Sequence, residues 1–277
     1  MDLTTIQAIE LAISHEMEAR RGYLALAQET EDPELQRLLR EIAQEEAGHE
    51  ASLRSRLRLY QERHLLRDTL SRYVSPEMAQ EILKNPELLK LGGERLEVTV
   101  LFADIRGFTS LSERLAPEKV VELLNTFFTE MVDLIFEYQG TLDKFLGDAL
   151  MAEFGVPVAI PQAPARAVEC ALAMRRRLQE MQAQGRTAIE GMRIGINTGE
   201  AIVGNIGSDK RMDFTVIGDV VNVAARLQEY AKELEAEILI SDATFRKVEG
   251  KFNLVSCPPA VLRGRRESTG IYQVLPA

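Results

Sequence analysis

The stretch Leu96–Ser110 limits what this chain can fold into more than any other part of the sequence. It predicts a strand over 96–104 that is apolar on both faces, as expected for a strand buried in the middle of a sheet. The strand ends on Asp104, and the chain then turns through Gly107 into a helix. A carboxylate at a strand end, beside the free amides of a helix N-terminus, makes a site for a cation and a phosphate together. The rest of the chain must supply the sheet around this strand and the other half of that site.

The C-terminal two thirds of the chain alternates short apolar runs with helical patterns. Strands at 141–145 and 148–154 are predicted to form one hairpin, and strands at 191–198 and 201–206 a second one around Thr198-Gly199-Glu200. A helix between the first strand and a hairpin predicts an α+β domain of the ferredoxin-like, split βαβ type. The other predicted elements are helices at 109–114, 117–138, 162–184, 220–231 and 241–247, and strands at 214–217, 236–240, 252–256 and 270–275.

The N-terminal residues predict an all-α hairpin of two helices. Residues 2–29 show helical apolar spacing, and a second helix is predicted to start with Asp32 as its N-cap and Pro33 at its first position. The short connection between them makes the two helices antiparallel neighbours. Two helices alone bury too little surface to be stable, so we expect a second copy of the hairpin to pack against them.

Three side chains of this hairpin form a candidate metal site. Glu16 lies in the first helix, and Glu46 and His49 lie three residues apart on one face of the second. A Glu from each of two helices plus Glu-x-x-His from each of two others is the ligand set of di-iron carboxylate bundles, and a dimer of the hairpin would provide it. Charged helices also contain Glu-x-x-His by chance, so the motif alone leaves metal binding open.

We predict three parts in the chain: a helical hairpin at 1–62, a helical linker at 63–94 and the sheet domain at 95–277. Leucines among many arginines predict that the linker pairs with its twin as a short coiled coil. A new helix is predicted after Ser75, and Leu91-Gly-Gly-Glu94 is predicted to be a connection of low order.

Composition excludes several classes of protein. The 277 residues carry a net charge of −10 at pH 7, which argues against sequence-independent nucleic-acid binding. The charged N-terminal thirty residues do not resemble a signal peptide, and the apolar stretch Val120–Phe136 contains three acidic residues, so we expect no membrane span. Cys170 and Cys257 are far apart and form no disulfide or metal pattern, which fits a cytoplasmic location.

Asp148 is a second carboxylate that belongs with Asp104. It starts a strand directly after a tight turn at Gly147. Two carboxylates on adjacent strand ends are a common way to hold paired magnesium ions for phosphoryl chemistry. A single Asp here would more simply be an ordinary strand-end residue, but a pair within two glycine-containing turns favours a metal site.

The sequence resembles the class III nucleotidyl cyclases. The resemblance covers residues from about 70 to 275 and rests on Phe102–Thr109, Asp143–Met151, Arg193–Gly199 and Thr215–Arg226, which match the family's motifs in order. It implies that Asp104 and Asp148 bind two Mg²⁺ or Mn²⁺ ions, with the carbonyl of Ile105 facing a metal. It also implies that the amides of Gly107 and Phe108 hold the β- and γ-phosphates.

The same resemblance makes Lys144 and Thr215 the purine-selecting pair. A Lys ammonium can donate to N1 of adenine and a hydroxyl can accept from its exocyclic amine, whereas guanine would favour an acceptor such as Glu. The pair therefore predicts ATP as substrate, and Thr at this position is similar to the subgroup often activated by bicarbonate.

Asn222 and Arg226 lie four residues apart on one helix face and match the family's transition-state pair, in which Asn orients the ribose and Arg neutralises the α-phosphate. Arg263 stands where the family has a Lys that contacts the triphosphate. In this family the metal ligands and the transition-state residues of one site come from opposite subunits. The resemblance therefore implies a homodimer that forms 3′,5′-cyclic AMP and pyrophosphate from ATP, with no obligatory general base.

Residues from about 5 to 62, including the Asp-Pro-Glu-Leu helix start, resemble the hairpins of rubrerythrins and encapsulated ferritins. This resemblance implies that Glu16, Glu46 and His49 bind iron at a two-fold interface. Only half of a four-helix bundle is present, which argues against iron storage or full oxidase activity.

Two other readings stay open from the sequence. One is a guanylate cyclase, which Lys144 and Thr215 disfavour. The other is an iron-binding protein in which the cyclase fold serves only for dimerisation, which the intact set of cyclase motifs disfavours. The sequence does not tell whether iron raises or lowers cyclase activity, or whether the hairpin is only a dimerisation clamp.

Overall fold

The computed structural model describes residues 3–70, 83–84, 92–157, 159–208, 210–260 and 268–276. The chain divides into two compact units, Met1–Arg72 and Tyr73–Ala277. The predicted helix after Ser75, apart from the helical residues 83–84, and the triphosphate residue Arg263 lie outside the described residues. Within the described part, no helix is both long and apolar enough to cross a membrane.

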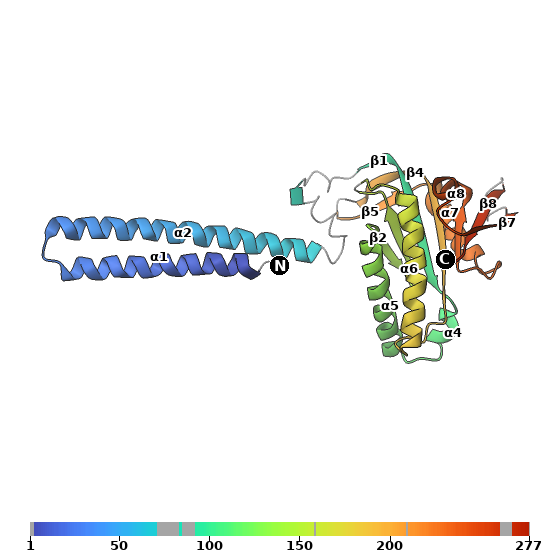
Figure 1. The fold of residues 1–277 in the computed structure, drawn as a ribbon, viewed down its shortest axis with the longest axis horizontal. Helices are drawn as coiled ribbons and strands as arrows, with labels where there is room; N and C mark the ends of the chain where they lie inside the picture. The colour runs from blue at the N-terminus through green and yellow to red at the C-terminus, as the bar shows by residue number, and fades with distance from the viewer. Residues whose placement is uncertain are drawn as a thin grey trace. The chain divides into compact units, whose positions relative to one another are not determined.

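The first unit is the predicted antiparallel hairpin (Figure 1), made of α1 (Leu3–Glu29) and α2 (Pro33–Leu70). Asp32 caps α2 as expected, because its Oδ1 accepts a 2.9 Å hydrogen bond from the amide of Glu34. Helix α2 continues through position 62, where the sequence predicted the hairpin to give way to a linker. The seam between the two helices is narrow, since Ile13, Ala27 and Ala43 are the hydrophobic side chains of the described hairpin that are fully buried.

The second unit is a mixed sheet with helices on both faces, and its strand order is β2-β3-β1-β4-β6-β8-β7, with β5 added beside β4. The α+β fold class predicted from the sequence is confirmed. The strands are β1 (Gly92–Ile105), β2 (Thr141–Leu146), β3 (Ala149–Phe154), β4 (Met192–Ser208), β5 (Arg211–Ile217), β6 (Ile238–Ser241), β7 (Leu254–Ala260) and β8 (Thr269–Val274).

Strand β1 lies inside this sheet, antiparallel to β3 on one side and to β4 on the other. Its alternate residues enter two different cores, as the doubly apolar pattern predicted. Leu101 and Ala103 face the core that contains α5 (Pro117–Glu137) and α6 (Ala163–Ala183), which lie side by side in Figure 1. Val98, Val100 and Phe102 face the core that contains α7 (Asp219–Tyr230).

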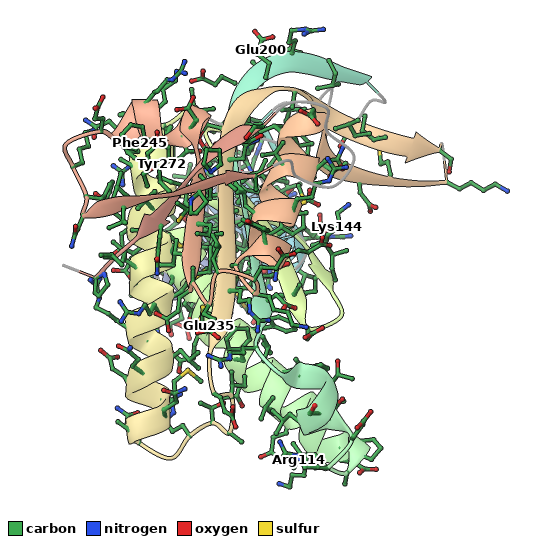
Figure 2. All side chains as sticks on the ribbon, turned by 90° about the vertical axis from the view of Figure 1, so that its right-hand side faces the viewer. Arg114, Lys144, Glu200, Glu235, Phe245 and Tyr272 are labelled. Atoms are coloured by element: carbon green, nitrogen blue, oxygen red, sulfur yellow. The ribbon has the colours of Figure 1, made fainter. Side chains whose placement is uncertain are left out.

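Two short helices complete the unit, α4 (Phe108–Ser112) and α8 (Asp242–Val248). Figure 2 shows Phe245 of α8 beside Tyr272 of β8, and the two rings stack with their centroids 3.9 Å apart.

The predicted hairpin around Thr198-Gly199-Glu200 is wrong. These residues continue β4 without a turn, because β1 is long enough to pair with them, and Thr99 meets Thr198 in a buried 3.0 Å hydroxyl contact. The hairpin of this region is formed instead by β4 and β5, which pair from Ile202 to Ser208.

The predicted low-order connection at Gly92 and Gly93 is also wrong, since both residues belong to β1 and pair with β4. Glycine is needed here because the strands come very close together. A Cβ added at Gly204 would lie 2.1 Å from the carbonyl oxygen of Gly92 and 2.6 Å from the Cα of Gly93.

Candidate active site

Asp104 and Asp148 meet at one end of the sheet. Asp104 is next to last in β1 and pairs with Ala149, and Asp148 directly precedes Ala149. The turn before Asp148 is made by Gly147, whose φ of 68° lies in the left-handed region that favours glycine. The sheet register therefore brings together the two carboxylates that the sequence selected.

The electrostatics of this pair suit a divalent cation. Burial, followed by the negative charge of Asp148, raises the pKa of Asp104 from 3.8 to about 6. Arg193, opposite Asp104 in β4, and the side chain of Gln228 act in the other direction. A buried carboxylate beside a second carboxylate gains from a cation that both can bind, and hard oxygen donors are what Mg²⁺ and Mn²⁺ prefer. The donor set therefore fits the metals implied by the sequence.

Gln228 was missed by the sequence analysis, although its Nε2 donates a 3.2 Å hydrogen bond to Oδ2 of Asp104. The contact requires α7 to lie directly on β4, and Gly195 permits this approach. A Cβ at Gly195 would lie 2.3 Å from the carbonyl oxygen of Ala224 and from the amide nitrogen of Gln228. The glycine of the 193–199 motif thus has a packing role, which only the structure shows.

Asn222 and Arg226 lie on the opposite side of α7 from its buried stripe. The buried residues of α7 are Val220, Val223, Ala224 and Leu227, whereas Asn222 is exposed and Arg226 is partly exposed. At roughly 100° per residue, Arg226 stands about 160° around the helix from Gln228, the residue that contacts Asp104. The structure does not bring the transition-state pair to Asp104 of the same chain.

The proposed phosphate-binding residues follow β1 directly. Gly107 is the N-cap of α4 with a φ of 73°, and no side chain caps the helix at this end, so its first amides are left for another acceptor. Phe108 is the first residue of α4, and Ile105 is the last residue of β1. All three lie within four residues of Asp104, in the order that the sequence predicted.

Lys144 and Thr215 come from β2 and β5 and meet at a common carboxylate, that of Asp143. The Lys144 ammonium lies 3.3 Å from Oδ1 of Asp143, and the Thr215 hydroxyl donates a 2.5 Å hydrogen bond to Oδ2. Figure 2 labels Lys144, whose side chain is 36% exposed, whereas that of Asp143 is fully buried. The structure thus brings the predicted purine pair together. It adds Asp143, the first residue of the motif Asp143–Met151, which the sequence analysis did not select as a site residue.

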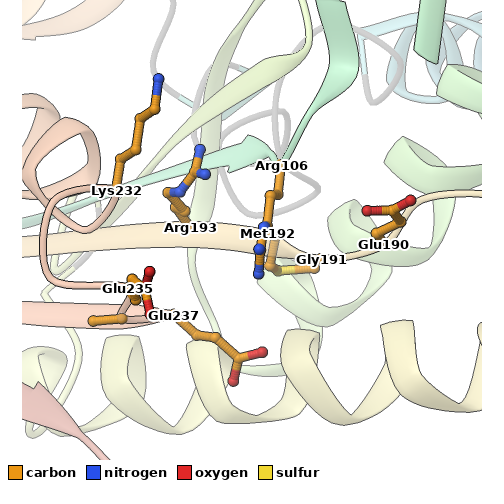
Figure 3. A pocket seen from close by; sticks show the side chains of 9 residues that line it. Arg106, Glu190, Gly191, Met192, Arg193, Lys232, Glu235 and Glu237 are labelled. Atoms are coloured by element: carbon orange, nitrogen blue, oxygen red, sulfur yellow. The ribbon is translucent and has the colours of Figure 1, made fainter. Parts of the chain in front are cut away.

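A pocket of about 260 Å³ lies beside this end of the sheet (Figure 3). Arg106, two residues after Asp104, and Arg193 line it together. Its lining carries both positive and negative side chains, and one of the acids, Glu237, forms an ion pair with Arg175. The charged lining residues are Arg106, Arg193, Lys232, Glu190, Glu235 and Glu237.

The hairpin brings its three predicted ligands together as well. Ligand atoms of Glu16, Glu46 and His49 lie within 4.8 Å of one another, and Nδ1 of His49 is 3.4 Å from Glu46 and 3.7 Å from Glu16. A hydrogen bond with Glu46, then burial, raises the pKa of Glu16. His49 is 65% exposed, so one face of this three-residue cluster is open to solvent or to a second copy.

Comparison with protein families gives two matches. Residues 93–275 match the model of the adenylate and guanylate cyclase catalytic domain, and residues 7–127 match that of rubrerythrin. The matches overlap at 93–127, where the structure has β1, α4 and the first half of α5. Because these elements belong to the sheet unit, we limit the rubrerythrin-like region to α1 and α2.

Curated relatives include adenylate cyclase 1 of Rhizobium meliloti, 32% identical over 75% of this chain, and a terminal-differentiation-specific adenylate cyclase of Dictyostelium discoideum, 34% identical over 76%. The chain spans 32% and 10% of their respective lengths, so only this domain is compared.

Solved structures include the adenylyl cyclase CyaB from P. aeruginosa, with 39% identity and a TM-score of 0.62 over 68% of this chain and 97% of that one. The guanylyl cyclase Cya2 matches nearly as well, with 37% identity and a TM-score of 0.59 over 66% and 94%. Overall similarity therefore does not separate adenine from guanine. From the motifs, the site and these matches together, the chain belongs to the adenylate and guanylate cyclase family and carries an N-terminal rubrerythrin-like region.

Proposed function

We propose that this chain is an adenylate cyclase that converts ATP into 3′,5′-cyclic AMP and pyrophosphate as a homodimer. The observation that supports cyclase chemistry most directly is the pair Asp104 and Asp148 at the end of β1, with the raised pKa of Asp104 and the neighbouring helix N-terminus. Mg²⁺ or Mn²⁺ held by these carboxylates would activate the ribose 3′-hydroxyl and stabilise the leaving pyrophosphate.

The chain's own residues position the nucleotide. The uncapped amides at Gly107 and Phe108, three and four residues after Asp104, would hold the β- and γ-phosphates. Lys144 donates to N1 of adenine and Thr215 accepts from its amine, which favours ATP over GTP. Positioning together with charge neutralisation accounts for the reaction without a dedicated general base.

We infer the homodimer because the site around Asp104 is incomplete within one chain. Asn222 and Arg226 point away from Asp104 of their own chain, so they serve the second site, where Asn222 orients the ribose and Arg226 neutralises the α-phosphate. Arg263 is proposed to bind the triphosphate on the basis of its sequence position alone. ATP as substrate and two reduced cysteines favour a cytoplasmic location.

Formation of cyclic AMP from ATP with Mg²⁺ or Mn²⁺, measured beside cyclic GMP formation from GTP, tests this function. Asp104→Ala is expected to lower turnover by more than about a thousandfold, since a metal ligand contributes several kcal/mol to the transition state. Turnover at the wild-type rate in Asp104→Ala would refute the site. Faster turnover of GTP than of ATP would identify a guanylate cyclase instead.

Mixing two inactive variants tests the shared sites. Asp104→Ala and Arg226→Ala chains each lack one half of every site in their own homodimers. A mixed dimer contains one intact site, so the mixture is expected to recover up to about a quarter of wild-type activity if the chains pair at random. A mixture as inactive as its components would mean that each chain builds its own site.

A second function, iron binding by the hairpin, is favoured by the convergence of Glu16, Glu46 and His49. Two copies across a two-fold axis would supply the four Glu and two His of a di-iron carboxylate site. Exposed leucines on both helices, including Leu26 and Leu38, also favour a second copy.

Metal analysis of purified protein tests the iron site, with Glu46→Ala/His49→Ala as the variant and Glu41→Ala, on the same helix but outside the cluster, as the matched control. We expect iron in wild type and control and none in the double variant. Cyclase rates of the iron-loaded and iron-free chain then show whether the hairpin regulates the sheet unit, and identical rates would leave it a dimerisation module.

A further inference from the structure

A buried pair of acids, Asp143 and Glu153, lies behind the proposed purine-binding residues. Asp143 is the extra residue of a β-bulge, because Leu142 pairs with Ala152 while Lys144 already pairs with Met151. A bulge re-aims the side chain that it carries. Here the side chain of Asp143 is completely buried, and the bulge, not the regular alternation of the strand, determines its direction.

The contacts of Asp143 decide what the Thr215 hydroxyl can do. A hydroxyl has one proton to donate and can otherwise only accept. At 2.5 Å, Thr215 donates its proton to Oδ2 of Asp143, so the Thr215 oxygen is left as an acceptor for any nucleotide. Thr215 is 9% exposed, and the hydroxyl has little room for another arrangement.

Glu153 is a second buried acid that interacts with Asp143. Glu153 is 0% exposed, and neither its oxygens nor Oδ1 of Asp143 has a hydrogen-bond partner among the described residues. Burial, followed by the charge of Asp143, raises the pKa of Glu153 well above its usual value. The Lys144 ammonium lies 3.3 Å from Oδ1 of Asp143, so the two oxygens of this carboxylate face Lys144 and Thr215 separately.

We propose that Asp143 is a specificity-determining residue that makes Thr215 an obligatory hydrogen-bond acceptor and thereby selects adenine. The exocyclic amine of adenine donates to that oxygen, whereas the guanine carbonyl at the same place would face a second acceptor. Without the Asp143 carboxylate the hydroxyl is free to rotate and donate to guanine. This inference rests on the proposed cyclase function, since it explains how that site distinguishes its two purines.

The ratio of kcat/KM for ATP to kcat/KM for GTP tests the inference in the full chain. Asp143→Asn is expected to lower this ratio about tenfold, the size of one hydrogen bond, because the amide can donate to Thr215 and reverse its polarity. Asp213→Asn makes the same change at an exposed position of β5, two residues from Thr215, and should keep the ratio.

Further variants distinguish a positioning role of Asp143 toward Thr215 from a general loss of structure in the site. Thr215→Val should lower the ratio by a similar factor, and adding Asp143→Asn to it should change nothing more, because the two residues act through one hydrogen bond. Glu153→Gln, which keeps the size of the buried side chain and leaves the contact between Asp143 and Thr215 in place, should keep the ratio. If Asp143→Asn does not fold, Asp143→Ser replaces it with the same expectation.

An unchanged ratio in folded Asp143→Asn, or additive losses in the double variant, would overturn the inference. Those results leave the cyclase function standing, since the wild type would still form cyclic AMP. Absence of cyclic AMP formation by the wild type would instead refute the proposed function itself.

Discussion

Strand β1 and helix α1 are both apolar enough to need cover, but they obtain it in different ways. The central residues of β1, from Val98 to Ala103, are at most 8% exposed because helices of the same chain cover both faces of the sheet. In α1, Leu11 and Leu26 are 58% and 52% exposed although α2 lies along the helix. The sheet unit thus completes its own core, whereas the hairpin does not.

The sheet unit in turn lacks part of its proposed active site. The sheet unit is complete as a fold, yet Asn222 and Arg226 point away from Asp104. The hairpin lacks cover and the catalytic site lacks residues, and a second copy of the chain would supply both. If the proposed homodimer forms, the hairpin and the cyclase domain would both gain from the same pairing.

The largest contrast in stability is expected between Phe127→Ala in α5 and Leu26→Ala in α1. Phe127 is 0% exposed, so its loss should cost about 3–5 kcal/mol of unfolding free energy in the sheet unit. Leu26 is 52% exposed, so Leu26→Ala should change the stability of the isolated chain by less than about 0.5 kcal/mol. It should weaken association instead.

Hydrogen exchange read separately for peptides of each unit, at several protein concentrations, measures both effects. Equal losses in the two variants, independent of concentration, would show that the hairpin is as self-sufficient as the sheet unit.

Replacing one glycine by alanine in each unit should change the free energy of unfolding by smaller amounts and with opposite signs. Gly195→Ala should destabilise the sheet unit by about 1–3 kcal/mol and lower cyclase activity, because its Cβ collides with the backbone of α7. Gly22→Ala in α1 should stabilise the hairpin by about 0.5–1 kcal/mol, since nothing lies within 4 Å and alanine is the better helix former. Denaturant titration measures both, and a tolerated Gly195→Ala would contradict the close approach of α7 to β4.

The pH dependence of metal binding at the sheet site gives a further contrast with the hairpin. With a pKa of about 6, Asp104 is ionised in about one molecule in eleven at pH 5 and about ten in eleven at pH 7. Mn²⁺ should therefore bind about tenfold more weakly at pH 5, measured by calorimetry in the Glu46→Ala/His49→Ala variant, which lacks the hairpin ligands. Equal affinity at the two pH values would contradict the raised pKa.

The stability of the metal-free chain should move in the other direction. Because the folded pKa of Asp104 is above its unfolded value of 3.8, proton binding favours the folded state. This contribution is fully present below pH 3.8 and is lost as the pH rises through about 6. Asp148→Asn removes the neighbouring charge and should reduce both pH effects.

Local signals in the sequence were enough for much of this protein. The doubly apolar run of β1, the Asp32-Pro33 helix start and the helical spacing of Glu46 and His49 depend on residues close together in the chain, and each was predicted correctly as structure. The cyclase motifs added the site residues in order, and the match over 93–275 confirms the family that they indicated.

The tertiary structure decided what depends on pairing between distant segments. A glycine at 199 is typical of a turn, but the length of β1 keeps it inside β4. The bulge at Asp143 arises from the register between β2 and β3, and the contact of Gln228 with Asp104 depends on how closely α7 approaches Gly195. Spacing along the chain indicates which face a residue is on. Register and close approach are set by partners on other elements, so only the folded sheet could show them.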